Sequence, residues 1–309
     1  MKTSKRKIIV RVILIFILLN IIACPIITKI IYDSIFPRYD ETVDIDPKYQ
    51  ELYASRKEFD FISDGNRLSG YLYDSENKDI LVVLAPGFNA SCDEYISVIS
   101  SFHDAGLGVC TFDCTGSCTS EGKSQVGFQQ ELIDLDAALD FLKDQGEEGY
   151  ENVAVFGHSR GGYAAGAIAL FDHDEIDSVV TVGGINSAME GIMEPAVDMM
   201  GKFAYANYPM LYLYQLYLFG SDYTKAACVS ALDTDKDLPI LVIHGADDEK
   251  IALDEYSIYS HKAEIEALGR AGETEFYLGQ TEGKSGHVDI LGDEKVIGEA
   301  ISFIEENVR

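Results

Sequence analysis

The sequence predicts an α/β protein built on a mostly parallel sheet with helices on both faces. Five continuous apolar runs read as strands that are buried on both faces. They lie at 80–85, 109–112, 153–156, 178–182 and 240–243. Segments with helical periodicity alternate with these runs. Such alternation indicates a parallel sheet covered on both sides, because each parallel connection must cross the sheet.

Two further patterns fix the local elements. Glu58–Ile62 and Leu68–Tyr73 alternate in hydropathy around the turn Asp64-Gly65-Asn66, which predicts an antiparallel hairpin at the sheet edge. Helices are expected at about 93–105, 127–144, 160–171, 252–268 and 293–307. The second of these is the clearest, because its leucines and alanines recur along one face between Phe128 and Leu142.

Composition excludes some functions. The 309 residues are 47% hydrophobic, which suits a large folded core, and the formal net charge is −28. Residues 1–31 hold 6 of the 24 basic residues and no acidic one, so the remainder carries 18 basic against 52 acidic residues, or −34. Without a basic surface to offset phosphate repulsion, a nucleic-acid partner is not expected.

The N-terminus predicts a membrane segment. Residues 2–11 are basic, and the 17 residues Val12–Thr28 form an apolar run just long enough to span the hydrocarbon core. Arg11 and Lys29 can snorkel at its two ends. We expect residues 1–32 to be a cytoplasmic basic end plus an uncleaved transmembrane signal anchor. The basic flank predicts a single-pass protein of the cell membrane with its acidic domain outside the cytoplasm.

Three other interpretations of the N-terminus stay open. The segment could be a cleaved signal peptide, which would make the protein secreted, although no Ala-x-Ala-like site follows it. Ile21-Ile22-Ala23-Cys24 looks like a lipoprotein signal, although Asn20 and Pro25 flank it. A buried helix of a soluble protein is the last alternative. The polar residues 33–57 that follow are expected to be a linker or a wrap-around arm, before a domain at 58–309.

One stretch carries the chemistry. Val153–Phe156 runs into Gly157-His158-Ser159-Arg160-Gly161, and small helix formers follow. A strand, a tight turn and a helix in this order strain the serine backbone and lift its hydroxyl above the sheet. Serine is a poor nucleophile near neutral pH, so this interpretation requires a base and a group that orients the base.

Suitable partners follow downstream. The buried strand before His244-Gly245-Ala246-Asp247-Asp248 ends in an acidic loop, and Gly286-His287 follows a further strand at 275–278. In these motifs and their order, residues 58–307 resemble the α/β-hydrolase superfamily. The resemblance implies an α/β-hydrolase fold with Ser159 as nucleophile, His287 as base and Asp248, rather than Asp247, as the acid.

The resemblance also implies an oxyanion hole. One backbone N–H is expected from Arg160, and the other from Phe88 in the loop Pro86-Gly87-Phe88-Asn89, with Asn89 as the alternative. Three positions depart from the family: Pro86, where a histidine is usual, and Thr115 and Cys118, where the loop 113–120 usually has an arginine and a glycine. That loop is interpreted as structural.

The 6 cysteines leave one question open. A Cys114–Cys118 disulfide and free buried thiols are equally compatible with the sequence. Metal binding is not expected, because no histidine lies near these cysteines in sequence.

Residues 186–232 interrupt the alternation of strands and helices. They hold five of the chain's 6 methionines together with six tyrosines. In the resembling families a cap usually lies here, so we expect a helical cap insertion whose adaptable apolar side chains partly line an acyl pocket. These side chains would also serve as the core of the cap itself.

The expected function is that of a serine hydrolase that cleaves carboxylic esters through an acyl-enzyme intermediate, without a cofactor or metal. The partner is a small-molecule ester or acyl substrate, and the oligomeric state is left open. A peptidase, amidase or thioesterase of the same fold is the first alternative. A catalytically silent binding protein is the second.

Overall fold

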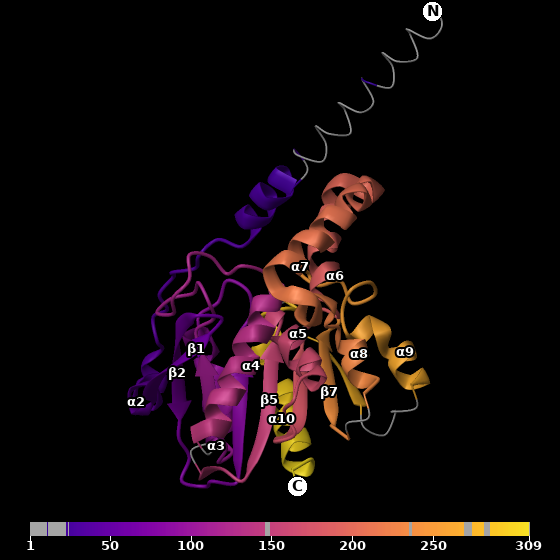
Figure 1. Ribbon diagram of the computed structural model, residues 1–309. Helices are drawn as coiled ribbons and strands as arrows, with labels where there is room; N and C mark the ends of the chain where they lie inside the picture. The colour runs from indigo at the N-terminus through magenta and orange to yellow at the C-terminus, as the bar shows by residue number, and fades with distance from the viewer. Residues whose placement is uncertain are drawn as a thin grey trace, which may run out of the picture.

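The structure is a computed structural model that describes residues 11, 23, 25–145, 149–234, 237–268, 274–280 and 285–308. These residues form an eight-stranded sheet in the order β1-β2-β4-β3-β5-β6-β7-β8 (Figure 1). The strands are β1 Lys57–Ser63, β2 Asn66–Tyr73, β3 Ile80–Ala85, β4 Gly108–Phe112, β5 Asn152–His158, β6 Ile176–Val182, β7 Ile240–Gly245 and β8 Thr274–Gly279.

The pairing confirms the predicted mostly parallel sheet. β1 pairs with β2 and β2 with β4 in antiparallel fashion, and the remaining neighbours are parallel. The predicted edge hairpin is present, with Asp64 at φ 45° and Gly65 at φ 79°. Two consecutive residues with positive φ suit a tight turn between twisted antiparallel strands.

Helices cover both faces of the sheet. They are α2 Gln50–Ser55, α3 Ile96–Asp104, α4 Phe128–Gln145, α5 Arg160–Ala167, α6 Ala188–Met200, α7 Tyr208–Lys225, α8 Cys228–Leu232, α9 Lys262–Ala267 and α10 Glu294–Glu306. In β3, Leu81 and Val83 belong to the core shared with α4, α5 and α8, whereas Val82 and Leu84 belong to the core shared with α3 and α10. The side chains of a central strand alternate between two dry layers, which explains its continuous apolar run.

One predicted helix is shorter than expected. Helical structure in the segment 252–268 covers only a 3-10 turn at Tyr259–His261 and α9, so the prediction for 252–258 is wrong. The Ser257 hydroxyl donates to the carbonyl of Leu253 and accepts from the N–H of Ser260. The N–H of Ile258 donates to the carbonyl of Gly184, in the segment after β6. These bonds offer the backbone alternatives to a helix.

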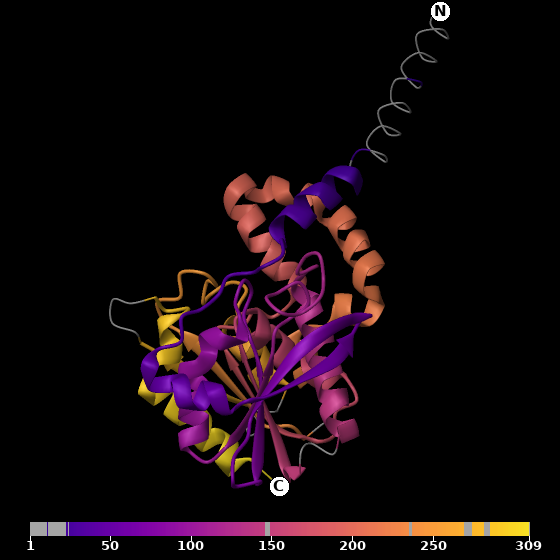
Figure 2. The ribbon, with the colours of Figure 1, turned by 90° about the vertical axis from the view of Figure 1, so that its left-hand side faces the viewer.

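Between β6 and β7 the chain forms a helical layer, which we call the cap (188–232). It consists of α6, a 3-10 helix at Gly201–Asn207, α7 and α8. Gly201 at φ 60° and Gly220 at φ 73° lie at the bends of this layer. Figures 1 and 2 show α6 and α7 projecting above the sheet, at the end of the molecule remote from the C-terminus.

The described part of the N-terminal segment is a helix at residues 25–35 that lies beside the cap (Figure 2). Thr28, Tyr32 and Phe36, spaced four residues apart, are buried against the cap. The helix therefore continues through the predicted boundary between residues 32 and 33. Most of the predicted span Val12–Thr28 lies outside the described residues. Within the described residues, no helix is both long and apolar enough to cross a membrane.

The segment after this helix packs along the body of the molecule. The Arg38 guanidinium donates to the carbonyls of Ser120 (3.0 Å) and Gly122 (2.8 Å). The loop held in this way contains Cys114 and Cys118, which are both free thiols. The alternative of a Cys114–Cys118 disulfide is therefore wrong: Cys114 is buried against the Glu131 carboxylate, whereas Cys118 lies beside Glu41 O nearer the surface.

Candidate active site

Ser159 occupies the sharp turn between β5 and α5. Its backbone lies at φ 57° and ψ −117°, a conformation that a non-glycine residue adopts only under strain. The turn requires glycine on either side of the serine. A Cβ at Gly157 would lie 2.1 Å from Gly161 O, and one at Gly161 would lie 2.1 Å from Ala85 O. The Gly-x-Ser-x-Gly pattern is thus explained by close backbone contacts.

The predicted partners of Ser159 meet it at the same edge of the sheet. His287 Nε2 lies 2.9 Å from Ser159 Oγ, and His287 Nδ1 lies 2.8 Å from Asp248 Oδ2. Asp248 comes from the loop after β7, and His287 from the segment after β8. The structure therefore brings the three predicted residues into one hydrogen-bonded chain. Asp247, the rejected alternative, is exposed.

The carboxylate of Asp248 is held by several donors. Its Oδ1 accepts hydrogen bonds from the backbone N–H groups of Lys250 and Ile251, each at 2.8 Å. Burial acts to raise the pKa of Asp248, but the hydrogen bond and charge of His287, together with these N–H groups, bring it below its ordinary value. The carboxylate is therefore ionised at neutral pH, which favours the Nδ1–H tautomer of His287.

A second histidine braces the site, and the sequence did not reveal its role. The ring of His158 contacts the Tyr95 hydroxyl at Nδ1 and the His287 carbonyl oxygen at Nε2, both at 2.9 Å. The Tyr95 hydroxyl also accepts the N–H of Gly87 at 2.7 Å. Burial lowers the pKa of His158 to about 3, so its ring is neutral. The three hydrogen bonds then point the same way. The Gly87 N–H donates to the Tyr95 hydroxyl, which donates to His158 Nδ1, and His158 Nε2–H donates to the His287 carbonyl.

The loop after β3 lies against the serine. A Cβ at Gly87 would lie 3.3 Å from the Ser159 Cβ. Phe88 and Asn89 follow it, and the N–H of Asn89 donates to Gln125 Oε1 at 3.3 Å. The Gln125 amide also donates to the Asn89 side chain and to Pro37 O. Gln125 therefore ties this loop to the N-terminal arm, a contact between residues far apart in sequence.

A buried ion pair involves Arg160, the residue after Ser159. Arg160 Nη2 is 2.7 Å from Glu131 Oε2, and both side chains are at most 1% exposed. The Cys114 thiol donates to the same carboxylate at 2.8 Å. Burial raises the pKa of Glu131 to about 7, although Arg160 and Cys114 act to lower it. Burial and the nearby Glu131 carboxylate raise the pKa of the Cys114 thiol, so it is not a reactive thiolate.

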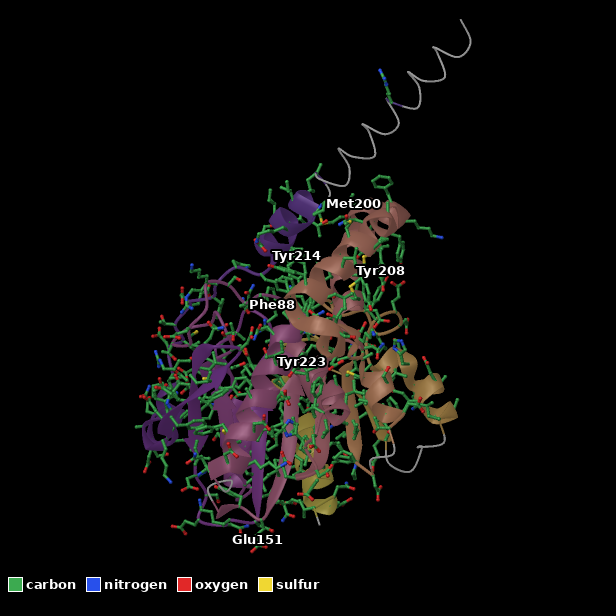
Figure 3. All side chains as sticks on the ribbon, in the orientation of Figure 1. Phe88, Glu151, Met200, Tyr208, Tyr214 and Tyr223 are labelled. Atoms are coloured by element: carbon green, nitrogen blue, oxygen red, sulfur yellow. The ribbon has the colours of Figure 1, made fainter. Side chains whose placement is uncertain are left out.

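An apolar cluster adjoins the site on the cap side. The Phe36 ring packs edge-on against Phe88 and Phe128, at centroid distances of 5.4 and 5.3 Å. Met189 and Met193 of α6 belong to the same cluster. Figure 3 shows Phe88 below Tyr214, between the sheet and the cap. The cluster thus extends from the cap to the loop beside Ser159.

Within the described residues, no group of three or more histidine, cysteine, aspartate or glutamate side chains could hold a metal ion. The arrangement found is instead suited to proton transfer between a hydroxyl and an imidazole.

Comparisons with known proteins identify a family and a fold. Residues 76–238 match the family model described as serine aminopeptidase, S33. No curated protein sequence matches the chain. Among solved structures, an esterase of Pyrococcus furiosus superposes with a TM-score of 0.64 at 19% identity, covering 87% of this chain and 98% of that one.

Two further structures are similar in the same way. An α/β hydrolase from Penicillium sp. gives a TM-score of 0.59 at 17% identity, covering 82% of this chain and 98% of that one. Est1E from Butyrivibrio proteoclasticus, solved with ferulic acid bound, gives 0.57 at 16% identity, covering 81% and 98%. At these identities the likeness establishes the shared α/β-hydrolase fold.

Proposed function

The chain belongs to the serine aminopeptidase S33 family of hydrolases, and from that premise we propose that it is a serine hydrolase of carboxylic esters. The observation that carries the proposal is the hydrogen-bonded chain from Ser159 Oγ through His287 to Asp248. A hydroxyl next to an imidazole, itself oriented by a buried carboxylate, is the arrangement that activates a serine nucleophile.

In the proposed mechanism Ser159 attacks the ester carbonyl while His287 Nε2 takes its proton. Asp248 stabilises the imidazolium, which then protonates the departing alcohol. Water enters with His287 as base and releases the acid from the acyl-enzyme. Backbone N–H groups of Arg160 and Phe88 would stabilise the oxyanion. The engagement of the Asn89 N–H by Gln125 favours Phe88 over Asn89 for this role.

The preference for esters rests on the surroundings of the serine. Phe88 and Phe128 are partly exposed aromatic members of the cluster and would offer an apolar wall for an acyl chain, with Phe36 and the cap methionines packed in the same cluster. Two of the similar structures are described as esterases or carry ferulic acid, which is consistent with this preference. Peptidase or amidase activity is the second candidate, favoured by the description of the family model. Thioesters are cleaved by the same chemistry.

The proposal is tested with a fluorophosphonate probe and a panel of nitrophenyl esters of increasing chain length beside aminoacyl amides. We expect labelling of the wild type, none of Ser159→Ala, and ester rates well above amide rates. Amide rates above ester rates would favour the peptidase. Intact protein that neither reacts with the probe nor turns over any substrate would instead be a binding protein of the hydrolase fold.

We also propose that the N-terminal segment anchors the protein in the cell membrane with the hydrolase domain outside the cytoplasm. The support is the basic residues 2–11 followed by the apolar run Val12–Thr28. The full chain should remain with membranes after alkaline carbonate washing, and protease added outside the cell should digest the domain. Release by carbonate, or protection from the protease, would contradict the anchor or its orientation.

A further inference from the structure

We propose that the cap and the N-terminal helix together form a membrane-docking face, through which Ser159 receives an acyl ester dissolved in the lipid bilayer. This inference rests on the proposed function and specifies its substrate class. The docking face consists of exposed apolar side chains on the helix at 25–35 and on α6, the following 3-10 helix and α7. They are Ile26, Ile27, Ile30, Ile31, Met199, Met200, Phe203, Leu213 and Tyr217.

The N-terminal helix is apolar on two opposite sides. One side, with Thr28, Tyr32 and Phe36, is buried against the cap. The other presents four isoleucines to solvent, at exposures between 52% and 63%. The ion pair between Lys29 and Asp33 is also exposed on this helix, so the isoleucines form an apolar strip beside it. The fold covers only the side with Tyr32, and an exposed apolar strip of this kind indicates an interaction surface.

The cap adds larger side chains to the same face. Met199 is 85% exposed, Phe203 73% and Tyr217 82%. Scattered exposed apolar residues are common, but Met199, Met200 and Phe203 lie close together in sequence, and such a group of large exposed apolar side chains indicates an interaction surface. Lys202 lies next to Phe203 and is exposed, so its ammonium group can reach lipid headgroups while its stem follows the apolar surface.

The two parts of the face are joined by specific contacts. The Thr28 hydroxyl donates to Asn207 Oδ1 at 3.2 Å, at the junction of the 3-10 helix and α7. The Tyr214 hydroxyl donates to Asp33 Oδ1 at 3.2 Å, and the Tyr32 and Tyr214 rings pack edge-on. Figures 1 and 2 show the N-terminal helix and the cap at the same end of the molecule, with the C-terminus at the other. In Figure 3, Met200 and Tyr208 lie at this end, and Glu151 lies at the opposite one.

A bilayer, rather than a second copy of the chain, fits this face. The apolar run Val12–Thr28 of the proposed membrane segment overlaps the start of this helix, so Ile26 and Ile27 belong both to that run and to the docking face. Tyr205 and Tyr208 are also exposed beside the face, where phenol groups would meet the headgroup layer. The strongly acidic body would then remain in water, away from anionic lipid.

The inner sides of the same helices lead toward the serine. Tyr32 and Phe36 of the N-terminal segment belong to one buried cluster with Met193 and Phe219 of the cap, and Phe88 packs against it. Phe88 follows Gly87, where an added Cβ would lie 3.3 Å from the Ser159 Cβ. Continuous apolar packing therefore connects the docking face to the loop beside Ser159.

Docking can be measured without reference to catalysis, because the chain contains no tryptophan. Phe203→Trp and Tyr217→Trp are made in the full chain and reconstituted in phosphatidylcholine vesicles with brominated acyl chains. Leu170→Trp is the matched control. Leu170 is 38% exposed and is the last residue of the 3-10 turn that follows α5. Helix α5 begins directly after Ser159 and runs away from the edge of the sheet above which α6 and α7 project. We expect at least twofold stronger quenching of both cap variants than of the control.

Quenching at the control level would overturn docking, and a dimer in light scattering would then show that a second copy covers the face.

Delivery of the substrate from the bilayer to Ser159 is tested by the double variant Phe203→Ser/Tyr217→Ser. Its rate on a long-chain ester embedded in vesicles should fall several-fold, with hydrolysis of water-soluble nitrophenyl acetate unchanged. An unaltered ratio of the two rates would overturn delivery. Absence of all hydrolysis with strong quenching would refute the hydrolase proposal alone.

Discussion

The imidazole of His158 donates from Nε2 to the backbone carbonyl of His287 at 2.9 Å, although 129 positions separate the two residues. The residue that precedes Ser159 therefore holds the loop that carries His287. Because Tyr95 links the other side of the ring to Gly87, the same contact connects that loop to the one beside the proposed oxyanion hole.

The first prediction concerns the three residues of the hydrogen-bonded chain. Ser159→Ala, His287→Ala and Asp248→Asn should each lower kcat by roughly 10³–10⁶-fold, and combining them should add little, because the residues act as one unit. Steady-state rates on a short nitrophenyl ester measure this. Asp247→Asn is the matched control, since the side chain of Asp247 is exposed. A large loss in the control with a tolerated Asp248→Asn would reverse the assignment of the acid.

The second prediction concerns Tyr95. Tyr95→Phe removes the hydroxyl that joins Gly87 to His158, and it leaves two buried polar groups unpaired. We expect a loss of about 1–3 kcal/mol in the free energy of unfolding and a roughly tenfold slower labelling of Ser159 by a fluorophosphonate. Tyr39→Phe, which removes an exposed hydrogen bond to Glu94, should change neither. Normal labelling in Tyr95→Phe would show that this bracing is dispensable.

The third prediction concerns the buried ion pair. Arg160→Met leaves the Glu131 carboxylate uncompensated in the core, so the free energy of unfolding should fall by about 3–5 kcal/mol. Adding Glu131→Gln should recover much of that loss, because it removes the unpaired charge. Urea denaturation of the two single variants and the double variant measures the coupling. Strictly additive effects would mean that the two groups do not stabilise each other.

The fourth prediction concerns pH and the attachment of the cap. His173 contacts Asp136 and Glu175, each at 2.7 Å, and the Tyr223 hydroxyl of α7 donates to Asp136 at 2.5 Å. Burial acts to lower the pKa of His173, but the two carboxylates raise it above its ordinary value. Its stabilising contribution is therefore complete below about pH 6.5 and is lost as the pH rises through the higher folded pKa.

His173→Gln should accordingly cost about 1.5–3 kcal/mol near pH 6, and progressively less at higher pH. Denaturation of both proteins across this range provides the measurement. Glu175→Gln should weaken the same pH dependence, because it removes one of the two carboxylates. A cost that is constant with pH would show that the histidine is not charged in the folded protein.

The fifth prediction concerns the N-terminal helix. Tyr32 is 2% exposed between the helix and the cap, whereas its neighbour Ile31 is 52% exposed. Tyr32→Ala should cost about 3–5 kcal/mol of local stability and make the cap sensitive to limited proteolysis. Ile31→Ala should leave the cleavage pattern of the detergent-solubilised protein unchanged. Equal resistance in both variants would mean that the helix does not support the cap.

The sequence by itself determined the sheet and predicted which three side chains meet at its edge. Continuous apolar runs, helical periodicity and the tight glycine turn around Ser159 are local patterns, set by burial on two faces and by backbone sterics. Ser159, Asp248 and His287 each come after a parallel strand, which places them at one edge, because parallel strands end at the same side of a sheet.

Only the tertiary structure decided the partners that lie far apart in the chain. Nothing in the sequence marks Tyr95 as the partner of His158, or His173 as the bridge between Asp136 and Glu175. Residues 252–258 read as helical, but Ile258 and its neighbours bond instead to the segment after β6. Likewise the isoleucines and Tyr32 of the N-terminal helix are all apolar, and the packing of the cap selects which side is buried. Long-range hydrogen bonds and packing depend on which surfaces meet, and a one-dimensional pattern does not carry that information.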